Sequence, residues 1–199
     1  MTRVVLATRN RSKLAELTRI IAARPELTGV ELVSADEADV ADVEEVGTTF
    51  AENALLKARA GAARGWPCLA DDSGLVVDAL DGAPGVHSAR YAGGHGDDEA
   101  NLRLVLERME GVAHRRARFV CAAALVAPDG REWVEEGVVE GRLLDRARGE
   151  GGFGYDPIFV PDGDTRTTAE MPAEEKDAIS HRGKAFRAIV AHLREVVAG

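Results

Sequence analysis

Residues 68–74 read Cys-Leu-Ala-Asp-Asp-Ser-Gly, and this stretch predicts a strand that ends in two carboxylates. The apolar run 68–70 is typical of a buried strand. Asp71 and Asp72 would then lie beside a sharp turn, where Gly74 can take backbone conformations closed to other residues. Adjacent carboxylates repel each other, so a metal, a cation or water has to compensate them. Taken alone, the stretch fits a solvated turn and a metal site equally well.

The composition indicates one domain over residues 1–199, because a chain of this length with 45% hydrophobic residues can bury one sizeable core. Its 34 acidic and 25 basic residues give a net charge of -9. That balance excludes a non-specific nucleic-acid binder but allows a small anionic ligand in a local basic pocket. Cys68 and Cys121 lie in apolar runs and read as reduced core thiols. With no signal peptide or membrane-spanning run, we expect a cytoplasmic protein without a membrane partner.

Hydrophobic spacing predicts a mixed α/β domain with some antiparallel sheet. Strands are expected at 3–7, 30–33, 68–72, 75–77, 118–127 and 132–144, with a turn at 128–130 between the last two. Helices are expected from about residue 14 to the stop at Pro25, after a capping box at 49–52, after a cap at Asp97 or Asp98, and around 186–197. A glycine-rich loop is expected at 82–96.

Two of these helices begin with basic residues, which reverses the charge order that a helix dipole favours. The first follows a strand–loop–helix junction whose free backbone N–H groups suit an anion; the junction consists of Thr8, Arg9, Asn10, Arg11, Ser12 and Lys13. The last helix is expected to start at Ser180 as N-cap, with His181, Arg182 and Lys184 in its first turn. One reversal fits a solvated basic turn, whereas two in the same sense indicate an external anion.

Further polar residues gather around the helix that begins near Thr49. Asn53 and Lys57 lie one turn apart on this alanine-rich helix and form either an inward polar face or a solvated face with local side-chain pairs. Glu44 and Glu45, just before the helix, offer more carboxylates.

A second glycine-rich stretch, residues 149–157, surrounds two aromatic residues. The glycines let the backbone approach a ligand closely, and Phe153 or Tyr155 offers a flat stacking surface. Asp156 is an acceptor that could read N–H groups. A hairpin loop with buried aromatics is the alternative, but the concentration of glycine favours a planar ligand.

Together, cationic helix starts for phosphates, clustered carboxylates for Mg²⁺ and a loop for a base predict a Mg²⁺-dependent nucleoside triphosphate enzyme. At this point the chain resembles the inosine/xanthosine triphosphate pyrophosphatase family, which clears non-standard purine nucleotides. The resemblance runs in order along the whole chain. It includes Leu6–Thr8 with Asn10 and Lys13, Thr49–Phe50 with Glu52–Ala54 and Lys57–Ala58, Ala70–Gly74, Gly82–Gly85 with Ser88–Tyr91, Gly151–Pro157, and Glu175–Lys176 with Ser180–Gly183.

The resemblance implies a two-lobed α/β fold, with a long mixed β-sheet flanked by helices and a central active-site cleft, usually in a homodimer. It implies Mg²⁺-dependent hydrolysis of dITP, ITP and XTP to the monophosphate and pyrophosphate. Carried over by motif, Asp72 is the general base, and Glu44 and Asp72 are the Mg²⁺ ligands. The residues that would bind the phosphates are Thr8, Arg9, Asn10, Arg11, Ser12, Lys13 and Lys57. Phe153 would stack on the base. The residues that would bind the rest of the nucleotide are Ser73, Phe153, Gly154, Tyr155, Asp156, Lys176, His181 and Arg182.

The chain departs from the family pattern at Arg9 and Ser12, where many relatives have glycine. The assignment of Glu44 over Glu45 rests only on spacing from Gly47, and Asp71 is left as a supporting carboxylate. A sensor that binds a triphosphate without cleaving it would use the same loops, but it gives no reason for the gathered carboxylates.

Overall fold

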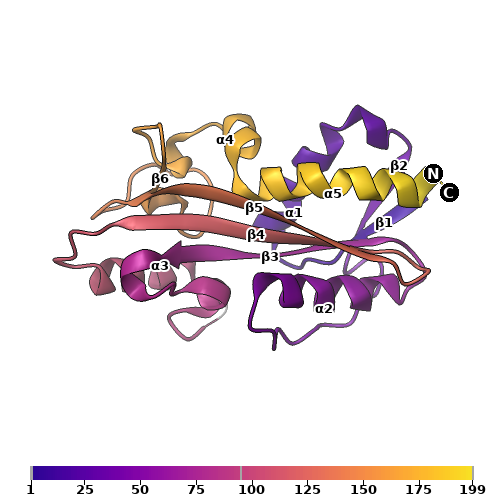
Figure 1. Ribbon diagram of the computed structural model, residues 1–199, viewed down its shortest axis with the longest axis horizontal. Coiled ribbons are helices and arrows are strands. Elements are labelled where there is room, and N and C mark those ends of the chain that lie inside the picture. The colour runs from indigo at the N-terminus through magenta and orange to yellow at the C-terminus, as the bar shows by residue number, and fades with distance from the viewer. Residues whose placement is uncertain (1, 95, 199) are drawn as a thin grey trace. The chain divides into compact units, whose positions relative to one another are not determined.

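The computed structural model describes residues 2–94 and 96–198, and therefore leaves out Met1, His95 and Gly199 (Figure 1). One sheet contains six strands in the order β2-β1-β3-β4-β5-β6. β1 pairs in parallel with β2 and β3, and β5 pairs antiparallel with β6, so the sheet is mixed. The strands are β1 Thr2–Leu6, β2 Val30–Ser34, β3 Cys68–Val77, β4 Arg116–Val126, β5 Glu132–Leu143 and β6 Phe159–Pro161.

The helices start where side chains satisfy their first backbone N–H groups. Asn10 caps α1 by accepting from the Lys13 N–H, and Asp97 caps α3 through the Ala100 N–H. Thr49 and Glu52 form the expected capping box of α2. The helices are α1 Arg11–Ala22, α2 Phe50–Ala62, α3 Asp98–Arg108, α4 Ala173–Ile179 and α5 His181–Ala198. Short 3-10 turns lie at Pro25–Leu27, Asp78–Leu80, Gly85–Arg90, Asp156–Ile158 and Thr168–Glu170.

The chain divides into two compact units. The first consists of residues 2–72, 121–137 and 182–198, and the second of residues 73–120 and 138–181. Strands β3, β4 and β5 contribute residues to both.

The core of the first unit lies on both faces of its strands. Side chains alternate along β1, so Val4 and Leu6 pack with the apolar stripes of α1 and α5, while Val5 packs with the alanine face of α2. The same alternation continues in β3, where Leu69 belongs to the first cluster and Ala70 to the second. Helices therefore flank the sheet of this unit on both faces.

The second unit has its own cluster, in which α3 packs against the far parts of β3, β4 and β5. Its largest buried members include Leu75, Met109, Ile158 and Phe159. Among the described residues, no helix is long and apolar enough to cross a membrane.

The prediction of a sharp turn at Gly74 is wrong, because strand β3 continues through residues 71–74 to Val77. Gly74 is instead required by close packing: a Cβ there would lie 2.3 Å from Ser88 Oγ and 2.5 Å from the Gly85 carbonyl oxygen. The other expected strands and helices are present with shifts of one to three residues at their ends. The active-site cleft and the homodimer stay predictions.

Candidate active site

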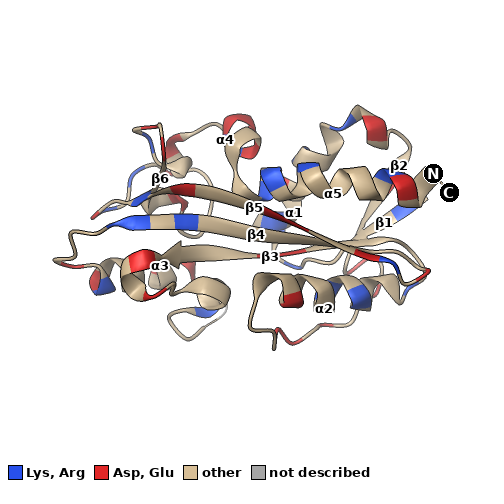
Figure 2. Ribbon diagram, in the orientation of Figure 1, with Lys and Arg blue, Asp and Glu red and all other residues tan. Residues whose placement is uncertain are grey.

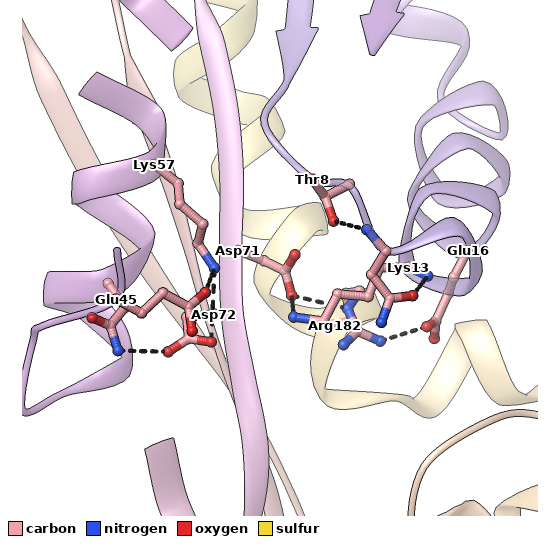
Figure 3. A network of polar contacts seen from close by, with 10 residues as sticks. Thr8, Lys13, Glu16, Glu45, Lys57, Asp71, Asp72 and Arg182 are labelled. Atoms are coloured by element: carbon pink, nitrogen blue, oxygen red, sulfur yellow. Dashed lines mark hydrogen bonds and ion pairs between the residues drawn. The ribbon is translucent and has the colours of Figure 1, made fainter. Parts of the chain in front are cut away.

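β3 presents its two adjacent carboxylates to opposite faces of the sheet. Asp71 is 1% exposed and Asp72 is 5% exposed. Successive side chains of a strand point in opposite directions, and Figure 3 shows Asp71 and Asp72 on either side of the β3 ribbon. The mutual repulsion, for which a metal, a cation or water was expected to compensate, is therefore reduced by the strand itself, and the two carboxylates make their direct contacts with different cations.

On the α2 side, Asp72 contacts two polar side chains of that helix. Asn53 Nδ2 donates to Asp72 Oδ2 at 3.1 Å, and Lys57 Nζ lies 3.8 Å from Asp72 Oδ1. Lys57 also donates to Glu45 Oε1 at 2.7 Å. Asn53 is fully buried, so these helix positions form the inward polar face, and the solvated alternative is wrong.

The charges in this group shift one another's pKa values. Burial raises the pKa of Asp72, and nearby Glu45 adds to that effect, while Lys57 and Lys13 act against it. Burial would lower the pKa of Lys57, but the carboxylates of Asp72, Asp71 and Glu45 raise it above its usual value. Lys57 therefore stays an ammonium at neutral pH.

Of the two glutamates before α2, Glu45 is the one that reaches this group. Glu44 is exposed, whereas Glu45 is half-buried against Lys57. Gly47 makes this approach possible, because a Cβ there would lie 2.6 Å from Asn53 Oδ1. The Gly47 N–H donates to that same oxygen at 2.8 Å. The geometry thus favours Glu45 over Glu44 as the partner carboxylate of Asp72.

On the opposite face, Asp71 contacts one basic side chain from the first turn of α1 and one from the first turn of α5. Its Oδ2 lies 3.2 Å from Lys13 Nζ and accepts from Arg182 Nε at 3.2 Å. Arg182 also donates to Glu16, and both of these side chains are buried. Although burial opposes ionisation, Lys13 and Arg182 hold the pKa of Asp71 well below its usual range.

This internal network changes the interpretation of the basic helix starts. Neither α1 nor α5 has an acidic residue in its first turn, and Figure 2 shows the basic start of α5. Asp71 and Glu16, however, supply two negative charges to Lys13 and Arg182 from within the protein. An external anion is therefore not needed to explain Arg182, whose role in substrate binding stays a prediction.

The junction at 8–13 is divided between structural and exposed residues. Thr8 Oγ1 accepts from the Asn10 N–H at 3.3 Å. Arg9 donates to Asp36 Oδ1 at 3.2 Å and to the Val40 carbonyl at 2.8 Å, and it pairs with Asp42 at 2.7 Å. Arg9 thus holds the neighbouring 36–42 loop. Arg11 and Ser12 are exposed in the first turn of α1.

In the second unit, the stretch 152–156 wraps around the Asp156 carboxylate. Tyr155 is buried, and its hydroxyl donates to the Ser88 carbonyl at 2.8 Å, so the buried-aromatic alternative holds for this residue. Phe153 is half-buried, and Lys176 Nζ lies 4.9 Å from its ring centroid. The Gly154 N–H donates to Asp98 Oδ2 at 2.9 Å.

Two further predicted residues lie elsewhere in the second unit. Ser73 is half-buried in β3. His181 is buried and stacks on Phe119, with ring centroids 4.7 Å apart and an interplanar angle of 11°. Ser180 precedes it in an extended conformation, as an N-cap requires.

Sequence reasoning missed Glu16 and Thr168. Glu16 follows Lys13 by one turn and lies next to Leu17 on the apolar face of α1, which was a signal of an inward charge. Thr168 donates to Asp156 Oδ1 at 2.8 Å, and no pattern in the sequence indicated it.

The fold and these side chains define a class of protein: an α/β protein with paired carboxylates and ammonium groups suited to a phosphorylated ligand. A sequence model of the Ham1 family matches residues 4–192. The chain therefore belongs to the Ham1 family.

Several relatives match this chain over nearly the full length of both sequences. The dITP/XTP pyrophosphatase of Streptomyces coelicolor is 58% identical over 203 residues, covering 99% of this chain and 100% of the relative. A solved Ham1 protein from Coxiella burnetii superposes with a TM-score of 0.86 at 42% identity, covering 98% and 100% of the two chains. The dITP/XTP pyrophosphatase structure from Mycobacterium abscessus gives 0.74 at 50% identity, covering 94% and 98%. These matches confirm the resemblance and the fold class inferred from the sequence.

Proposed function

We propose that this protein hydrolyses dITP or ITP and XTP at the α–β phosphoanhydride, with Mg²⁺, and releases the nucleoside monophosphate and pyrophosphate. Membership of the Ham1 family and the names of its relatives make the chain a nucleoside triphosphate pyrophosphatase, a hydrolase of nucleotide metabolism. The observation that carries the finer proposal is the surroundings of Asp72: a buried carboxylate oriented by an amide, beside an ammonium and a second carboxylate.

Asp72 is suited to be the general base. A base must be ionised before reaction and still basic enough to take a proton from water. Burial raises the pKa of the Asp72 carboxyl, while Lys57 favours its ionised form. The hydrogen bond from Asn53 fixes the direction in which the carboxylate faces. In the proposed reaction, Asp72 takes the proton of the water that attacks the α-phosphorus.

Mg²⁺ fits Glu45 and Asp72. Both are hard oxygen ligands, and both already lie around one positive charge, the ammonium of Lys57. No three His, Cys, Asp or Glu side chains within residues 2–94 and 96–198 are grouped as metal ligands. Two carboxylates are a usual protein share for Mg²⁺, which keeps waters and substrate phosphates as its other ligands. When bound, Mg²⁺ withdraws charge from the triphosphate and favours attack by water.

The remaining roles follow from charge and shape. Lys57 and Lys13 carry ammonium groups that can neutralise phosphate oxygens, and the exposed first turn of α1 adds backbone N–H groups. Phe153 offers a partly exposed ring for stacking. Hypoxanthine and xanthine share a 6-oxo acceptor, whereas adenine has an amino donor there that would leave site donors unpaired.

A product assay tests this proposal. The protein is incubated with dITP, XTP, GTP and ATP, with and without Mg²⁺, and pyrophosphate and orthophosphate are measured separately. We expect pyrophosphate from dITP and XTP only when Mg²⁺ is present. Tight binding without pyrophosphate would indicate a nucleotide sensor, and orthophosphate as the first product would indicate attack at the terminal phosphate.

We also propose that the enzyme acts as a homodimer in the cytoplasm, with no nucleic-acid partner. The net charge of -9 supports the last point, since nucleic-acid binding needs a basic face. Light scattering on the purified protein tests the dimer, and a monomeric mass would contradict it.

A further inference from the structure

The Asp156 carboxylate was expected to read N–H groups of the ligand, yet its oxygens accept hydrogen bonds from the protein. Oδ2 accepts from the Phe153 N–H at 2.9 Å and from Lys176 Nζ at 2.5 Å. Oδ1 accepts from Thr168 Oγ1 at 2.8 Å. The side chain is only 4% exposed. A carboxylate so enclosed and so occupied is placed to organise its neighbours.

Three separate segments converge on this carboxylate: the 152–154 stretch, the 3-10 turn Thr168–Glu170 and helix α4. The approach of the first is so close that a Cβ at Gly152 would lie 2.1 Å from Asp156 Oδ2. Gly152 also has a φ of +69°, which favours glycine. Glycine at 152 therefore serves the contact with Asp156 as well as the turn.

The most consequential neighbour is Lys176, an ammonium whose residue is 6% exposed. A buried charge is costly unless it is paired and hydrogen-bonded, and Asp156 is its carboxylate partner at 2.5 Å. The same ammonium lies 4.9 Å from the centroid of the Phe153 ring, a favourable cation–π distance. Asp156 thus fixes both the backbone of Phe153 and the cation that covers its ring.

We propose that Asp156 is a positioning residue that acts through Lys176 and Phe153 and makes no contact with the purine. This inference rests on the proposed function, in which Lys176 and Phe153 bind the nucleotide. The ammonium of Lys176, held by Asp156, is a donor suited to an acceptor such as the 6-oxo group. Asp156 then determines how well the base is bound and has little influence on the attack at phosphorus.

A double-mutant cycle tests the inference, with Asp156→Asn, Lys176→Met and the double variant measured on dITP. Asparagine keeps the shape and an acceptor but removes the charge that holds Lys176. We expect each single variant to raise KM by about tenfold or more, the scale of a lost charge-assisted hydrogen bond, with kcat changed less than KM. The double variant should be no worse than Lys176→Met, because asparagine can still accept from the Phe153 N–H and the contact that it loses, the one with Lys176, is already absent.

Multiplied effects in the double variant would overturn the inference, since Asp156 would then contact the substrate itself. A fall in kcat alone, with KM unchanged, would overturn it too. Asp162→Asn is the matched control, because Asp162 pairs with Arg116 on the surface of the same unit. If Asp156→Asn does not fold, Thr168→Val removes one donor to the carboxylate and keeps its charge. Its smaller rise in KM should vanish in the Lys176→Met background, and its persistence there would refute the inference.

The two proposals fail differently. If the wild-type protein binds dITP but releases no pyrophosphate, the proposed function fails. The double-mutant cycle is then repeated with the Kd for dITP, measured by calorimetry, in place of KM. A double variant no weaker in binding than Lys176→Met would support the inference, and multiplied effects would overturn it. If hydrolysis is normal but the variants act independently, only the positioning role fails.

Discussion

At the residue scale, the informative feature is that Asp71 and Asp72 are neighbours in sequence but make their direct contacts with different side chains. Asp71 accepts from Arg182 and lies beside Lys13, whereas Asp72 accepts from Asn53 and lies beside Lys57. Strand alternation separates them. One of the pair is therefore committed to holding two helix starts together, and the other faces the residues that we propose carry the chemistry.

The two glutamates before α2 give a prediction at the same scale. Glu45→Gln should raise the Mg²⁺ concentration needed for half-maximal activity by at least about tenfold, the scale reported for lost metal-site contacts. Its side chain lies against Lys57 near Asp72, while Glu44 is exposed. Glu44→Gln is the matched comparison and should change this concentration much less. A larger effect from Glu44→Gln in a Mg²⁺ titration would restore Glu44 as the ligand.

At the element scale, the long amphipathic helices could be predicted and the short elements could not. The stripes of α1 and α5 and the capping box of α2 are strong local signals, and all three helices are present. Helix α4, with seven residues, and β6, with three, are too short to show a period. The false turn at Gly74 arose because glycine after acidic residues is typical of turns, whereas here glycine makes room for Ser88.

The contact between α1 and α5 gives a prediction at the element scale. Glu16→Gln removes a buried negative charge from Arg182 and should lower the free energy of unfolding by about 3 kcal/mol, as when one partner of a buried ion pair is lost. Denaturant unfolding measures it. Glu132→Gln is the control, because Glu132 pairs with Arg59 at the surface, and it should cost less than about 1 kcal/mol. Equal losses would show that the buried network adds no special stability.

At the scale of the whole molecule, the sequence predicted the α/β class and the family, and the family is confirmed over residues 4–192. The sequence could not predict which polar residues serve the protein itself. Arg9, Tyr155 and Asp156 lie in stretches that the sequence assigned to ligand binding, yet their polar groups contact other protein groups. Such assignments depend on long-range neighbours, such as Asp36 for Arg9, that no local pattern specifies.

Metal removal gives a prediction for the whole molecule. EDTA should abolish turnover and leave the melting temperature within about 2 °C of its value with Mg²⁺, a shift that corresponds to at most about 1 kcal/mol. Lys57 already places a positive charge between Glu45 and Asp72, so these carboxylates do not need the metal in order to be tolerated in the fold. Differential scanning fluorimetry with and without EDTA checks this, and a large fall in melting temperature would show that Mg²⁺ is structural.

The central claim, that Asp72 is the base of a pyrophosphatase, is tested most directly by Asp72→Asn. Pyrophosphate release from dITP with saturating Mg²⁺ is measured beside the Kd for dITP. Asparagine preserves the shape next to Asn53 and Lys57 but cannot take a proton. We predict that binding is retained and that kcat falls by at least about 100-fold, the usual scale for a general base. Near-normal turnover by this variant would contradict the mechanism.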